Sequence, residues 1–94
     1  MKLVWSPTAK RSRANQIAYI AERNPQAALD MANAIRAATD RLANYPRLGR
    51  PGRVQGTREL VVPRTPYIVI YQIEGDTVGI IRVLHSAQRW PPLN

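Results

Sequence analysis

Gly56-Thr-Arg-Glu-Leu-Val-Val62, Tyr67-Ile-Val-Ile-Tyr-Gln-Ile73 and Val83-Leu-His-Ser-Ala-Gln-Arg-Trp-Pro91 are the segments of this sequence that decide its fold. Their β-branched and aromatic residues, separated by turn residues, predict a three-strand meander over residues 57–62, 67–74 and 77–85. Glu74-Gly75-Asp76 is typical of a tight hairpin between the second and third strands. The middle strand is apolar on both faces, which predicts a central position in a sheet that helices cover on one side.

The residues before the meander predict one strand and two helices. Residues 2–5 alternate as a short strand would, and Ser6-Pro7 and Asn24-Pro25 each place a capping side chain before a proline. Such pairs start helices, here over residues 7–23 and 25–45, and the short linker makes them an antiparallel hairpin. The fold class is therefore α+β, in the order β-α-α-β-β-β, with a helical hairpin packed on a small, mostly antiparallel sheet.

The two helices differ in the quality of their apolar side. The second has apolar residues at helical spacing from Ala28 to Tyr45, whereas Arg13 and Gln16 interrupt the apolar side of the first. The aromatic residues Trp5, Tyr19 and Tyr45 are expected in the core. With 94 residues, the chain is expected to form one domain, residues 1–94, around one modest core.

Composition excludes several classes of site. The sequence has no cysteine and one histidine, so neither a disulfide framework nor a metal site is expected, and no motif predicts a cofactor. The first residues lack the long apolar run of a signal peptide or membrane span. The expected location is therefore the bacterial cytoplasm, and no interaction with a membrane is expected.

The net charge of +8 predicts an anionic partner. Arginine supplies 12 of the 14 basic residues, and its planar fork suits carboxylates and phosphates. Residues 46–56 read as a loop rich in glycine, proline and arginine, including Arg50 and Arg53. Arg58 follows this loop and is a candidate to hold a phosphate or a partner carboxylate, with a salt bridge as the alternative interpretation.

Strand alternation separates the candidate residues near the end of the meander. Counted along the strand, His85 shares a face with Val83 and Ile81, while Arg82 shares the other with Ile80 and Leu84, unless a bulge intervenes. His85 is therefore either a general acid or base of RNA cleavage or a histidine that binds backbone at a strand end.

Aromatic residues supply the remaining candidates. Arg89 and Trp90 pair a cation with an aromatic surface, as interfaces often do, although Trp90 also suits packing on the core. Tyr67 and Tyr71 share one face of the central strand, either in the core or on a concave surface.

The order of elements, with the words Ser6-Pro7, Asn24-Pro25-Gln-Ala-Ala28, Pro46-Arg-Leu-Gly-Arg50, Gly56-Thr-Arg-Glu-Leu60, Tyr67-Ile-Val-Ile-Tyr71 and Val83-Leu-His85 with Arg89-Trp-Pro91, resembles the ParE/RelE superfamily of bacterial toxins. The resemblance covers nearly the whole chain. It implies the toxin of a type II toxin–antitoxin system, of the kind that stabilises plasmids, in a hetero-oligomer with its antitoxin. That antitoxin is expected to be ParD-like, with an acidic C-terminal segment.

The branches of this superfamily differ in what they poison. RelE-like members are ribosome-dependent mRNA endoribonucleases, and their catalytic cations would fall near Glu59 and Val61, on Ile68, and near His85 or Ser86. Three of those four cations are missing here. Gly-Thr-Arg-Glu-Leu and Val-Leu-His instead resemble the ParE branch, whose studied members act on DNA gyrase and are not hydrolases.

The resemblance therefore implies a gyrase-inhibiting toxin without catalytic residues or cofactor. The residues expected to bind target or antitoxin are Arg50, Arg53, Arg58, Tyr67, Arg82, Arg89 and Trp90. The alternative is a ribosome-dependent endoribonuclease acting on mRNA, with His85 and Arg58 as its catalytic residues. A third interpretation is a basic module that binds bare DNA or RNA in a salt-dependent way, although the chain has no recognised nucleic-acid motif. Arg13 and Gln16 depart from the apolar residues that the family's first helix commonly carries.

Overall fold

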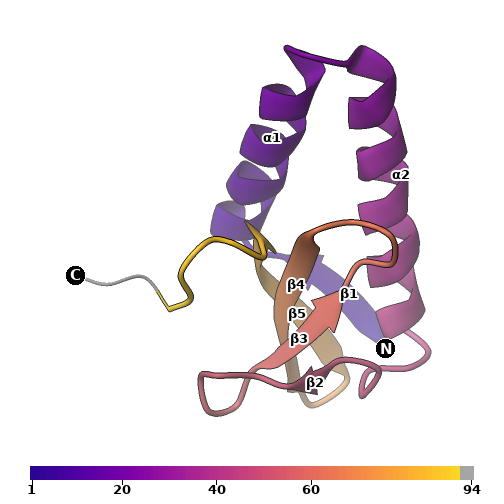
Figure 1. Ribbon diagram of the computed structural model, residues 1–94. Helices are drawn as coiled ribbons and strands as arrows, with labels where there is room; N and C mark the ends of the chain where they lie inside the picture. Colours follow the sequence, from indigo (N-terminus) through magenta and orange to yellow (C-terminus); the bar gives the residue numbers. More distant parts are fainter. Residues whose placement is uncertain (92–94) are drawn as a thin grey trace.

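Two helices pack against one face of a five-stranded sheet in the computed structural model, which describes residues 1–91 (Figure 1). The predicted α+β fold class and the order of the elements are confirmed. In chain order the elements are β1 (Lys2–Trp5), α1 (Pro7–Ala21), α2 (Pro25–Leu42), β2 (Arg50–Pro51), β3 (Arg58–Val61), β4 (Tyr67–Glu74) and β5 (Thr77–His85).

The sheet has the strand order β1-β5-β4-β3-β2, so β4 is central, as its apolar sequence predicts. β1 runs parallel to β5, and the other pairs are antiparallel. The bounds of β4 and β5 agree with the prediction, and β3 is one residue shorter at each end. β2 lies inside the segment predicted to be a loop, because two residues are too few to give a strand pattern.

Both helices begin where the capping residues predict. The Ser6 hydroxyl accepts the N–H of Ala9 at 3.0 Å, and the Asn24 side chain accepts the N–H of Ala27 at 3.1 Å. The helices end earlier than predicted, at Ala21 and Leu42. Tyr45 therefore lies beyond α2 and is 62% exposed. The prediction that it belongs to the core is wrong.

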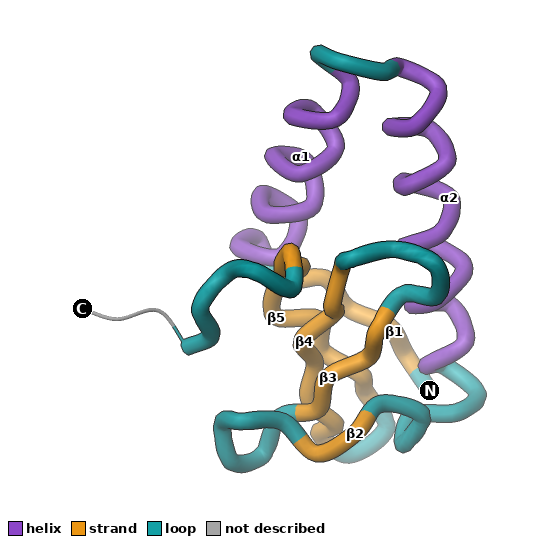
Figure 2. Tube along the Cα trace, viewed as in Figure 1, coloured by secondary structure: helices purple, strands orange, loops and turns teal. Residues whose placement is uncertain are grey.

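The helical hairpin extends past the sheet at its connected end (Figure 2). Tyr19, near that end of α1, is 58% exposed, so its predicted place in the core is also wrong. Its ring instead lies 4.2 Å from the Arg23 guanidinium. Trp5 packs partly buried against the core, and Arg13 lies over its ring at 4.2 Å. The arginine that interrupts the apolar side of α1 is thus held by a cation–π contact.

The sheet has apolar residues on both faces. The helix-side core contains Tyr67, Val69 and Tyr71 from β4, and residues of α2, β3 and β5 join them. A second, smaller cluster on the opposite face consists of Ile68, Ile70 and Leu84, with Ile81 and Trp90 packed against it. We call this opposite side the open face of the sheet.

A β-bulge at Ile81 changes the alternation of β5. Ile70 pairs with Arg82 and Tyr71 with Ile80, so Ile81 has no partner in β4. Ile80 therefore lies in the helix-side core and Ile81 in the cluster on the open face. The prediction that Ile81 shares a face with His85, and Ile80 with Arg82, is wrong, although His85 and Arg82 still lie on opposite faces.

Helix α1 supplies hydrogen-bond partners to the bulged edge of β5. β1 ends opposite Ile80, and beyond that point the first turns of α1 lie against β5. The Ser6 hydroxyl donates to the Ile81 carbonyl at 3.3 Å, and the Ser12 hydroxyl accepts the N–H of Val83 at 3.0 Å. Two serines thus satisfy backbone groups that a neighbouring strand would otherwise bind.

Candidate functional site

The Glu59 carboxylate fastens the arginine-rich loop to the open face. It receives the Arg50 side chain at 3.1 Å and the backbone N–H of Arg53 at 3.0 Å, with the Arg53 Nε at 3.6 Å. Glu59 is only 2% exposed, whereas the side chains of both arginines are about half exposed. Arg50 and Arg53 therefore hold their own loop and still present part of their cationic surface to solvent.

Nearby positive charge and burial shift the pKa of the Glu59 carboxyl in opposite directions. Burial would raise the pKa of its carboxyl, but the hydrogen bonds from the Arg53 N–H and the Arg50 side chain, with both positive charges, outweigh burial. Together they hold the pKa below its ordinary value of 4.5. The carboxylate is thus charged at neutral pH. Sequence reasoning missed this role, although Glu59 is the single acid among five arginines between residues 47 and 64.

Arg58 lies on the other face of β3. It pairs with Tyr71, a residue of the helix-side core, and alternation places it on the same face as Leu60. It is half-buried, and its Nε is buried without a hydrogen-bond partner in residues 1–91. The structure therefore separates Arg58 from Arg50, Arg53 and Arg82.

His85 is bound into a turn at the end of β5. Its Nδ1 accepts the N–H of Ala87 at 3.0 Å, and its own N–H donates to the Gln88 side chain at 2.7 Å. The Gln16 amide donates to the same Gln88 oxygen at 2.9 Å, which ties the turn to α1. This arrangement is the backbone-binding histidine that the sequence offered as one interpretation.

Trp90 covers the apolar cluster of the open face. It packs with Ile68, Ile70 and Leu84, and the Arg82 guanidinium lies 5.7 Å from its ring centroid. Its indole Nε1 is buried with no hydrogen-bond partner among the described residues. Arg82 and Trp90 therefore lie together, while the neighbouring Arg89 is exposed.

Tyr67 is not a surface residue. It is 4% exposed in the helix-side core, and its ring meets that of His85 edge to face at 5.4 Å. Burial raises the pKa of its hydroxyl above the ordinary value, with a further rise from Tyr19, so the group stays protonated. The expectation that Tyr67 lies on a binding surface is corrected, because its face of β4 is the one that the helices cover.

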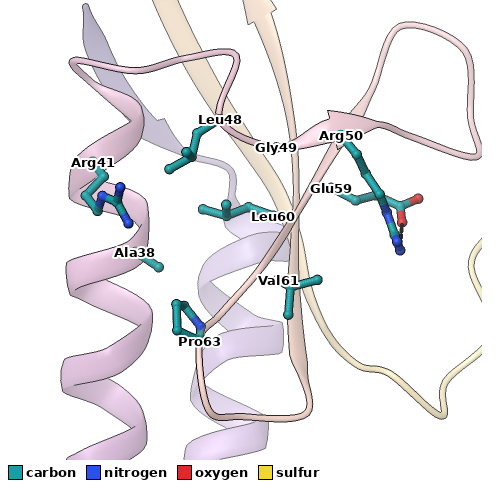
Figure 3. A pocket seen from close by; sticks show the side chains of 9 residues that line it. All are labelled: Ala38, Arg41, Leu48, Gly49, Arg50, Glu59, Leu60, Val61 and Pro63. Atoms are coloured by element: carbon teal, nitrogen blue, oxygen red, sulfur yellow. Dashed lines mark hydrogen bonds and ion pairs between the residues drawn. The ribbon is translucent and has the colours of Figure 1, made fainter.

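A groove runs between α2 and β3 on the helix side of the sheet (Figure 3). The part beside Leu60 has a volume of about 280 Å³, with Ala38, Leu48, Leu60, Val61 and Pro63 among its lining residues. Two adjoining hollows continue it along α2 past Ala34 and Arg64. Figure 3 shows Leu60 pointing toward α2, while Arg50 and Glu59 lie on the other side of β3.

The edge of β3 along this groove has unused backbone groups. The Val62 N–H binds Tyr67 in β4, and Gly52 on the other side binds the Thr57 carbonyl. Because backbone direction alternates along a strand, the N–H and C=O of Val61 point away from β4, beyond the end of β2. Val61 is also 50% exposed. Sequence reasoning missed this groove, since it joins residues far apart in the chain.

The open face contains three of the positions to which the resemblance draws attention. Glu59, Val61 and Ile68, near which the resemblance places catalytic cations, adjoin one another there because Val61 pairs with Ile68. Glu59 is a paired carboxylate, and Ile68 is buried in the cluster that Trp90 covers.

No three His, Asp or Glu side chains gather as a metal site within residues 1–91. No helix in that range is long and apolar enough to cross a membrane.

Comparisons with known proteins show which family the chain belongs to. Residues 3–90 match the family model described as the ParE toxin of type II toxin–antitoxin systems, parDE. The putative toxin Y4kP of Sinorhizobium fredii is 43% identical over 96% of this chain and 93% of its own length. Toxin RelE2 of Caulobacter vibrioides is 33% identical over 93% of this chain and 97% of its own length.

The fold is also similar to that of a solved structure described as the chromosomal ParDE toxin–antitoxin system from P. aeruginosa. The TM-score is 0.79 at 24% identity, over 88% of this chain and 92% of that chain. Fold and relatives together define the toxin of a type II toxin–antitoxin system. Within that class, the chain belongs to the ParE toxin family.

Proposed function

We propose that this toxin inhibits DNA gyrase, acts without catalysing hydrolysis, and is neutralised by direct binding of its cognate antitoxin. The observation that carries the proposal is the open face. Where a ribonuclease of the RelE kind would need cations, this chain has the paired carboxylate of Glu59, the apolar Val61 and the buried Ile68. Loss of one group that stabilises a transition state costs about 3–4 kcal/mol, so an RNA-cleaving site is not supported here.

The geometry of His85 supports the same proposal. Its Nδ1 accepts the Ala87 N–H, and its backbone N–H donates to the Gln88 side chain, so His85 holds the turn at the end of β5. This structural role favours a toxin without a catalytic histidine.

The groove between α2 and β3 supports the partner in the proposal. An extended antitoxin segment would bind the free N–H and C=O of Val61 as an added strand and place apolar side chains against Leu60 and Pro63. Arg41 and Arg64 also line the groove and its continuation, so an acidic ParD-like segment matches its charge. The complex is then a hetero-oligomer in the bacterial cytoplasm, and plasmid stabilisation would follow from its neutralisation by antitoxin.

The test distinguishes inhibition of DNA replication from inhibition of translation. The toxin is induced alone, and DNA supercoiling by purified gyrase, cleaved-DNA complexes and protein synthesis are measured in parallel. Inhibited supercoiling with translation intact early after induction is expected, together with rescue by the co-expressed antitoxin. His85→Ala should remain inhibitory. Early translation arrest with normal supercoiling would refute the proposal.

The alternative is a ribosome-dependent endoribonuclease acting on mRNA. The observation that favours it is the 33% identity to a relative named RelE2. Primer extension on mRNA after induction would then reveal discrete cuts that require ribosomes. His85→Ala and Arg58→Ala would abolish those cuts.

A further inference from the structure

A polar pocket lies where α1 meets the last residues of β5. Its volume is about 280 Å³, and it is separate from the groove between α2 and β3. β1 pairs with β5 only as far as Ile80. Beyond that residue, the same edge of β5 faces the first turns of α1. The pocket opens at this junction, beside the turn that contains Gln88.

The pocket is lined by hydrogen-bond donors and by no acid. Thr8, Arg11 and Asn15 share one side of α1 because they are spaced three and four residues apart. Arg82 enters from β5. Neither Arg11 nor Arg82 forms an ion pair with any other residue of the range 1–91. Two guanidinium groups from different elements thus adjoin one small space without a counter-charge.

Neighbouring contacts hold this arrangement in place. The bulge at Ile81 sets the direction of Arg82, and the Trp90 ring lies 5.7 Å from its guanidinium. The Gln88 side-chain oxygen accepts from both Gln16 and the His85 N–H, which leaves the Gln88 amide N–H groups as donors. Arg82 and Gln88 are therefore positioned before any ligand arrives, while Arg11 approaches the pocket from the exposed surface of α1.

We propose that this pocket binds a backbone phosphate of DNA. Arginine forks together with threonine, asparagine and glutamine donors are the groups that contact nucleic-acid phosphates. A polypeptide partner suits the apolar groove between α2 and β3 better, because that groove offers buried contact area and a free strand edge. The inference rests on the proposed function and deepens it, since an inhibitor of gyrase meets the DNA that gyrase holds.

The experiment measures binding of the purified chain to a fluorescent 20-base-pair duplex by anisotropy across a salt series. The variants are Arg11→Gln and Arg82→Gln, and Arg36→Gln on α2 is the control with the same change of charge. Each pocket variant should weaken binding several-fold and lower the slope of log K against log salt by about 1, while the control changes both less. Arg82→Lys should restore part of the slope. Circular dichroism checks the fold, and Arg11, which is exposed, gives a variant that leaves packing intact.

Three results would overturn the inference: no salt-dependent binding, equal losses in all three glutamine variants, or binding of an acidic poly-glutamate peptide in place of DNA. Gyrase supercoiling is measured on the same samples. DNA binding that depends on Arg11 while gyrase is unaffected would refute the gyrase proposal and leave this one standing. Gyrase inhibition without such DNA binding would refute the phosphate-binding inference and leave the gyrase proposal standing.

Discussion

The phenol oxygen of Tyr71 accepts the N–H of Gly49 at 2.8 Å, and its proton is donated to the Pro46 carbonyl at 2.7 Å. One buried hydroxyl of the central strand therefore fixes the loop that leads from α2 to β2. Gly49 lies so close to this ring that a Cβ there would be 2.7 Å from a ring carbon. The arginine-rich loop thus starts from a point anchored in the core.

Tyr71→Phe should lower the free energy of unfolding by about 1–3 kcal/mol, because two backbone groups of the loop lose their partner. Urea denaturation of the purified chain measures the change. Tyr45→Phe is the matched control, since Tyr45 is largely exposed, and it should have almost no effect. Equal stability of Tyr71→Phe and the wild type would show that the loop is not anchored through this hydroxyl.

Glu59→Gln should lower the free energy of unfolding by about 1–3 kcal/mol, since hydrogen bonds to charged groups are the stronger ones. The amide keeps the shape of the side chain but loses the charge that binds Arg50 and Arg53. Faster hydrogen exchange of the Arg53 amide should accompany the loss. Glu74→Gln, an exposed residue, serves as control, and an unchanged Arg53 amide would contradict the role of Glu59.

Stability should fall in acid because of Glu59. Its pKa is lower in the folded than in the unfolded chain, so the unfolded state binds the proton first as pH falls. The contribution of Glu59 is complete well above pH 4.5 and declines as pH drops below that value toward its folded pKa. Unfolding curves between pH 7 and pH 3 measure this decline, which should be smaller in Glu59→Gln. Parallel curves for the two proteins would refute it.

Ser12→Ala should destabilise the fold by about 1–3 kcal/mol, because the N–H of buried Val83 loses its acceptor. Ser86→Ala changes an exposed hydroxyl and should be nearly neutral. Thermal unfolding compares the two. If both variants melt like the wild type, water replaces Ser12 without cost and α1 does not complete the edge of β5.

Leu48→Glu should weaken neutralisation by the antitoxin while leaving toxicity unchanged. Leu48 lines the groove and is 40% exposed, so a carboxylate there would repel an acidic segment and prevent its apolar contacts. Co-expression with the antitoxin, scored by growth and by co-purification, measures the effect. Val4→Glu is the control, because Val4 is similarly exposed on the opposite edge strand of the sheet. Equal rescue of both variants would place the antitoxin elsewhere.

Local signals predicted the elements well. Capping by Ser6 and Asn24 and the hairpin at Gly75 depend on a few adjacent residues, so the sequence displays them directly. The bulge at Ile81 could not be predicted, because Ile80 and Ile81 are equally apolar and only their pairing with β4 distinguishes them. Tyr45 continues the helical spacing of α2 and Tyr19 was expected in the core as an aromatic residue, but the exposure of both depends on where the sheet and α2 end.

The candidate site was harder to predict because it depends on contacts between distant residues. Arg50, Arg53 and Arg82 were candidates on charge alone, and the structure brings them to the open face. Tyr67 lies in the core because the helices cover its face of β4, and Arg58 lies on the helix side because of strand alternation in β3. The importance of Glu59, Ser12 and Gln88 arises from partners that no spacing rule connects with them.

The parallel pairing of β1 with β5 has a consequence for how the chain is made. Leu3 pairs with Val78, so the hydrogen-bonding edge of β1 has no strand partner until β5, at the other end of the described residues, has been synthesised. Pairing between residues so distant in the chain is slow compared with helix formation. The helical hairpin can form during synthesis, whereas the sheet closes only after the ribosome has released β5. A newly made toxin molecule therefore has its helical hairpin before its five-stranded sheet is complete.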